Sequence, residues 1–127
     1  MNTKVLMTVS AGLMGFSGIA LIFMPAEILN FMTGELAGNT LILQILGSLY
    51  FAFAMLNWMA RGNLIGGIYS RPVAIANLTH FFIGGMALLK STGHNNLPVI
   101  WITGLIYLML AILFGIVVYT SPVKAVK

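Results

Sequence analysis

Four long stretches without a charged residue dominate this sequence and restrict the folds that it can adopt. They cover residues 5–24, 40–60, 72–89 and 98–120. Each is close to the roughly 20 residues that an α-helix needs to cross the hydrocarbon core of a bilayer. The strands of a membrane barrel would alternate polar and apolar side chains, and these stretches do not. The pattern therefore predicts four membrane-spanning α-helices.

The small share of charged residues points the same way. Only 6% of the 127 residues are charged and 60% are hydrophobic, whereas about a quarter of the residues in a soluble domain are charged. A soluble protein of this composition could not cover its core with a polar surface. We therefore predict one integral membrane domain over residues 1–127. It would be an all-α four-helix transmembrane bundle with antiparallel neighbours, because the connections are short.

Residues 25–33, between the first two stretches, carry the signals of a short helix. Pro25 suits a first helical position, Glu27 suits the first turn, and Gly34 suits a helix end. Four apolar residues make the segment too hydrophobic for a free loop, namely Ile28, Leu29, Phe31 and Met32. We expect a short helix that lies in the membrane interface.

The first apolar stretch has one feature of a signal peptide, since Lys4 precedes it. However, the run is long, and no clear small-x-small cleavage site follows it. We therefore expect this stretch to remain as the first transmembrane helix. Its small residues, which are Ala11, Gly12, Gly15 and Gly18, predict a close packing face rather than a homodimer seam.

The basic residues predict the orientation of the chain. With four spans, five of the six Lys and Arg residues fall on one side of the membrane, and Lys90 lies alone on the other. The five are Lys4, Arg61, Arg71, Lys124 and Lys127. Because Lys and Arg are enriched in short cytoplasmic loops, we expect both termini and the middle loop to be cytoplasmic.

Polar side chains inside the spans are the candidates for a functional site, because lipid offers them no partner. Depths counted at about 1.5 Å per residue place Tyr50, His80 and Tyr107 near the bilayer midplane. Asn57 and Asn77 fall in the cytoplasmic third. One interpretation is an internal pocket in which a neutral His80 bonds a ligand head group or relays a proton. The other is that these groups bond one another and only fix the helix packing.

The charged residues of the loops leave two questions open. Arg61 and Arg71 could bind lipid head groups or a partner, or could merely anchor the middle loop in the cytoplasm. On the opposite side, Glu27, Glu35 and His94 lack the spacing of a metal site, and we expect them to be solvated.

Missing residue types argue against several kinds of chemistry. Cysteine is absent, which removes disulfides, thiolate nucleophiles and Cys-based metal sites. Aspartate is absent too, and neither Glu lies in a span, so proton-coupled transport, Mg²⁺-dependent head-group transfer and a Ser/His/Asp triad are disfavoured. The scattered Lys and Arg residues form no basic face for nucleic acid. We expect no catalytic residue, metal or cofactor.

Three features of the sequence resemble a known kind of protein. They are the run Gln-Ile-Leu-Gly-Ser-Leu-Tyr-Phe-Ala-Phe-Ala over residues 44–54, the segment beginning at Pro25, and Arg71-Pro-Val-Ala before a span that contains Gly-Gly. Together they resemble small four-helix bacterial inner-membrane proteins of the DoxX-like and uncharacterised kind. Such families usually carry a charged residue near the start of the second membrane span, where this chain has Gln44. The resemblance implies a four-helix fold in the bacterial inner membrane and no particular activity.

These observations favour a non-enzymatic membrane protein. We expect an accessory or scaffold subunit whose partners are the lipid bilayer and either a second copy or a larger membrane complex. The alternative is binding or transport of a small apolar or amphiphilic molecule, such as a lipid or quinone, around Tyr50, His80 and Tyr107. A quinone-dependent membrane oxidoreductase is the third class.

Overall fold

The computed structural model describes residues 2–34, 38–63, 70–93 and 97–120, and within these ranges the chain forms five α-helices. They are α1 (Thr3–Phe23), α2 (Pro25–Thr33), α3 (Thr40–Ala60), α4 (Arg71–Ser91) and α5 (Pro98–Tyr119). The predicted all-α class, with four long helices and a short one between the first two, is confirmed. The predicted ends of the spans differ from the observed helix ends by at most two residues.

Local sequence signals set where the helices begin and end. Asn2 and Asn39 precede α1 and α3, and each side-chain oxygen accepts a hydrogen bond from a backbone N–H two residues later, at 3.1 and 3.2 Å. The other three helices have proline in their first turn, where a missing N–H leaves no bond unmade. These prolines are Pro25, Pro72 and Pro98. Gly34 ends α2 with a φ of +73°, a left-handed conformation that glycine adopts without strain.

Helix contacts divide the chain into two units, and the N-terminal unit (Asn2–Arg61) holds α1, α2 and α3. α1 and α3 are antiparallel and meet closely at Gly18 and Gly47. A Cβ atom placed on Gly18 would lie 2.8 Å from the carbonyl oxygen of Gly47, and one placed on Gly47 would lie 2.9 Å from that of Gly18. The two backbones can therefore approach this closely only because neither residue has a side chain.

The predicted packing face of α1 is correct in part. Ala11 and Gly18 are buried, and a Cβ on Gly15 would make ordinary contact with Ala54 at 3.4 Å. Gly12 is exposed, and a Cβ placed on it would meet nothing within 4 Å. Gly12 therefore lies outside the seam between α1 and α3.

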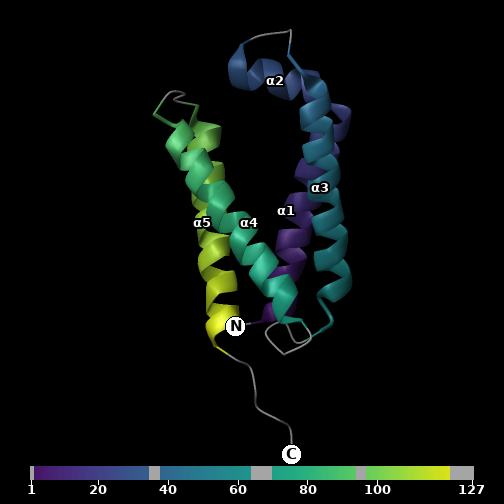
Figure 1. The fold of residues 1–127 in the computed structure, drawn as a ribbon, viewed down its shortest axis with the longest axis vertical. Helices are drawn as coiled ribbons and strands as arrows, with labels where there is room; N and C mark the ends of the chain where they lie inside the picture. Colours follow the sequence, from purple (N-terminus) through teal and green to yellow (C-terminus); the bar gives the residue numbers. More distant parts are fainter. Residues whose placement is uncertain (1, 35–37, 64–69, 94–96, 121–127) are drawn as a thin grey trace, which may run out of the picture. The chain divides into compact units, whose positions relative to one another are not determined.

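The short helix α2 lies across one end of the α1–α3 pair, as Figure 1 shows in dark blue. Pro25 is buried at its start, while Phe31 and Met32 are 63% and 39% exposed. An apolar helix placed crosswise at the end of two spans has the arrangement of an interfacial helix. Its depth in a bilayer stays a prediction.

In the C-terminal unit (Gly62–Lys127), the described helices α4 and α5 pair in antiparallel fashion. Glycine again sets the approach. A Cβ on Gly85 would lie 3.0 Å from Cδ2 of Leu108, and one on Gly104 would lie 2.9 Å from Cδ2 of Leu89. The assembly of both units into one bundle, and the single domain over residues 1–127, stay predictions.

Large apolar side chains are exposed on each of the four long helices. Phe16, Met59, Ile83 and Ile112 are 80%, 76%, 62% and 65% exposed. So much exposed apolar surface is unfavourable in water but expected where lipid is the solvent. All four helices are also long and apolar enough to cross a membrane. The chain is therefore a multi-pass membrane protein.

Candidate functional site

The structure brings two of the predicted site residues together on the α4–α5 pair. The rings of His80 and Tyr107 lie 5.7 Å apart between centroids. Tyr107 is buried and packs over Gly84, where a Cβ would lie only 3.0 Å from Cε1 of the tyrosine ring. His80 is half-buried at the edge of the helix pair. Both residues come from facing turns of antiparallel helices, which is why their matching predicted depth leads to contact.

Two aromatic residues that were not singled out in the sequence form the core beside this contact. Phe81 is fully buried and meets Tyr107 edge to face at 5.1 Å. It also stacks on Phe114 at 5.8 Å with an interplanar angle of 14°. Edge-to-face and offset-stacked rings contribute attraction beyond simple burial. The polar pair of His80 and Tyr107 is thus held by an aromatic cluster rather than by polar neighbours alone.

Each of the two asparagines has a partner near it in the sequence or on its paired helix. Asn57 on α3 is fully buried, and its side-chain amide donates to the hydroxyl of Ser10 on α1 at 3.1 Å. Asn77 on α4 is also fully buried and donates to the backbone carbonyl of Val73 at 2.9 Å. Ser10 and Asn57 both lie a few residues from a flanking basic residue, so their similar depth could have predicted the pair. Tyr50 lies half-buried on α3, in the N-terminal unit.

The two arginines proposed to bind head groups differ in their surroundings. The Arg61 guanidinium lies over the ring of Trp58, 3.3 Å from its centroid, which is the geometry of a cation–π contact. Its Nη1 atom is buried and has no hydrogen-bond partner among the described residues. Arg71, at the start of α4, is exposed. Arg71 is therefore the more accessible cation.

The loop residues considered for a metal site are only partly described. Glu27 is exposed on α2, while Glu35 and His94 lie outside the described residues. Within the ranges that the structure covers, no three His, Cys, Asp or Glu side chains come together.

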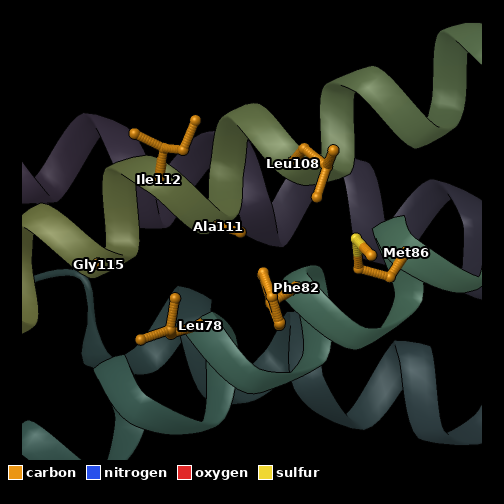
Figure 2. Close-up of a pocket in the computed structure, with 7 residues that line it drawn as sticks. All are labelled: Leu78, Phe82, Met86, Leu108, Ala111, Ile112 and Gly115. Carbon is orange, nitrogen blue, oxygen red and sulfur yellow. The ribbon is translucent and has the colours of Figure 1, made fainter. Parts of the chain in front are cut away.

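A concave groove lies between α4 and α5. Seven residues line it, namely Leu78, Phe82, Met86, Leu108, Ala111, Ile112 and Gly115. Figure 2 shows that the large side chains stand along its two sides, while Ala111 and Gly115 leave space on α5. Its volume is about 410 Å³, within the range of small-molecule sites. Every lining residue is apolar, so the groove fits a hydrocarbon chain.

On α4, His80 and the residues that line the groove lie on different sides of the helix. His80 is two residues from Leu78 and two from Phe82, and side chains two apart on a helix point about 200° apart. None of the predicted ligand-binding residues lines the groove. The sequence shows Ala111 and Gly115 as small residues four positions apart. What it could not indicate is that the opposite helix leaves the space beside them open.

Comparison with known proteins adds no relative: no protein-family model, no curated protein and no solved structure matches the chain. The class of protein therefore follows from its own features. It is a multi-pass membrane protein whose C-terminal helix pair carries an apolar groove.

Proposed function

We propose that this protein is a non-enzymatic membrane protein that binds the apolar chain of an amphiphilic molecule in the groove between α4 and α5. The observation that carries the proposal is the groove itself, with about 410 Å³ of space and only apolar residues around it. Phe82, Met86 and Ile112 are 53%, 53% and 65% exposed, so the groove is open along its length. A linear chain can enter such a groove sideways from the bilayer.

The site proposed here differs from the pocket expected around Tyr50, His80 and Tyr107. In a bilayer every exposed apolar surface touches lipid, so the presence of a lipid chain in the groove does not by itself show binding. Binding requires that a chain in the groove exchanges more slowly or binds more tightly than lipid on a convex helix face. A concave wall on two helices supplies more van der Waals contacts to a chain than one helix can.

A photoreactive lipid tests this proposal. Phosphatidylcholine with a diazirine in its acyl chain is expected to label Phe82, Met86 and Ile112 more strongly than Phe16 and Met59, which are exposed on α1 and α3. Gly115→Leu is expected to fill the groove, since even a Cβ placed on Gly115 would contact Leu78 at 3.7 Å. We expect it to lower groove labelling about tenfold, equivalent to a loss of about 1.4 kcal/mol.

The matched control is Gly12→Leu, because Gly12 is an exposed helical glycine with open space around it. This variant should leave groove labelling unchanged. Equal labelling of the groove and of the exposed faces of α1 and α3 in the natural protein would contradict the proposal.

A second candidate function, that of an accessory or scaffold subunit, is favoured by one separate observation. Thr8 and Gly12, one helical turn apart on α1, are both exposed. Small residues four apart are typical of surfaces where a transmembrane helix docks on another. If this surface binds a partner helix or a second copy, a photo-cross-linking residue at Val9 should capture one protein band, and Gly12→Leu should abolish it. Lipid adducts alone would contradict this role.

The expected setting of both functions is a bacterial inner membrane with the termini in the cytoplasm. The five-to-one distribution of basic residues and the resemblance to DoxX-like proteins support this part of the proposal.

A further inference from the structure

We infer that the occupant of the α4–α5 groove is an anionic phospholipid, with its phosphate held at Arg71 and one acyl chain in the groove. This inference rests on the proposed function, because it names the class of molecule that the same groove binds. An anionic occupant also requires a cation at one end of the groove, on the side of the helix pair where the groove lies.

Arg71 satisfies this requirement on α4. It precedes Leu78 by seven residues and Phe82 by eleven, and residues at these spacings share one face of an α-helix. Arg71 is exposed, as are Phe82 and Met86. The exposed face of α4 therefore carries the Arg71 guanidinium at its N-terminal end and the residues that line the groove on the following turns.

Tyr119 provides a matching polar group on α5. It follows Gly115 by four residues, Ile112 by seven and Leu108 by eleven, so it shares the groove face of α5. Gly115 lies opposite Leu78, which fixes the end of the groove that is nearer to Arg71 and Tyr119. Tyr119 is 83% exposed. Tyrosine at such a position is typical of the membrane interface, where its hydroxyl can donate to a lipid head group.

The distances along α4 match the dimensions of one leaflet. At about 1.5 Å per residue, Leu78 lies about 10 Å from Arg71 along the helix axis, Phe82 about 16 Å and Met86 about 22 Å. The hydrocarbon core is about 30 Å thick, so one leaflet supplies about 15 Å of acyl chain. A chain that begins at the level of Arg71 therefore passes Leu78 and ends close to the level of Phe82.

Charge decides between this occupant and a wholly apolar one. A guanidinium can make two parallel hydrogen bonds to a phosphate. Basic residues at the cytoplasmic edges of transmembrane helices attract anionic head groups. Arg61 is less suited, since its guanidinium lies over Trp58. Lys90, the other described cation of this unit, lies at the opposite end of α4.

Competition between two photoreactive lipids in one vesicle preparation tests the inference. Phosphatidylglycerol and phosphatidylcholine probes with the same diazirine-bearing chain are presented to the full-length protein in phosphatidylcholine vesicles. We expect phosphatidylglycerol to label Phe82 and Ile112 about fivefold more efficiently. Arg71→Gln should reduce this ratio to about one and leave labelling by phosphatidylcholine intact. Arg71→Lys should retain most of the preference.

Lys90→Gln is the matched control, because it removes one exposed cation from the other end of the same helix. Its ratio should equal that of the natural protein. Equal labelling by both probes in the natural protein would overturn the inference while leaving chain binding intact. So would an unchanged ratio in Arg71→Gln. Absence of groove labelling by either probe is a different result, and it would overturn the proposed function itself.

Discussion

Replacing Gly18 with alanine is expected to destabilise the α1–α3 pair by about 2 kcal/mol. A Cβ at this position would lie 2.8 Å from both the carbonyl oxygen of Gly47 and the backbone nitrogen of Phe51. Both contacts are to backbone, which cannot move aside as a flexible side chain can. The helices must separate or shift. Unfolding in mixed micelles titrated with a denaturing detergent measures the change.

Gly12→Ala is the control that isolates the contact from the helix propensity of alanine. Both substitutions gain the same intrinsic helix propensity of alanine over glycine, up to about 1 kcal/mol in a helix interior. At Gly12 the new methyl group would meet nothing within 4 Å, so this variant should be neutral or slightly stabilised. If Gly18→Ala and Gly12→Ala unfold at the same detergent fraction, the glycine contact described above is not present in the membrane.

The second large effect is expected from Phe81→Ala. Phe81 is fully buried and its ring contacts Tyr107 and Phe114. In lipid, the usual transfer contribution is small because lipid chains are as apolar as the core. The empty volume and the lost ring contacts remain, and we expect about 2 kcal/mol of destabilisation. The change is measured by the same detergent titration.

The neighbouring Phe82→Ala removes the same side chain from a different environment. Phe82 is 53% exposed and lines the groove, so lipid can fill the space that it leaves. This variant should change stability by less than about 0.5 kcal/mol yet weaken labelling of the groove. Equal loss of stability in both variants would show that the two phenylalanines are equally buried in the membrane.

The helices could be predicted from sequence because lipid imposes a strict rule on the backbone. An apolar run of about 20 residues has no alternative to helix there, so the spans follow from the positions of the charges. The short helix α2 was also predictable, because Pro25 and Gly34 mark its ends. These signals are local, so they set the ends of the helix independently of the tertiary packing.

The candidate site was less predictable because it depends on register between helices. The depth of His80 and Tyr107 indicated their contact, but the same reasoning overlooked Ser10 as the partner of Asn57. The groove arises where small residues of α5 face a gap between large residues of α4. A periodic pattern on one helix cannot reveal that gap, since the same pattern also suits a filled seam.

The pairing of α1 with α3 and of α4 with α5 has a consequence for how the protein is made. Each pair draws on one continuous part of the chain, so its contacts form within one unit. A pair that needs no residue from the other unit can form as soon as its own two helices are in the bilayer. Once residue 61 has left the insertion machinery, we expect the glycine contact between α1 and α3 to form in the bilayer before α4 is inserted. We therefore expect biogenesis to proceed in two steps, each of which completes one helix pair.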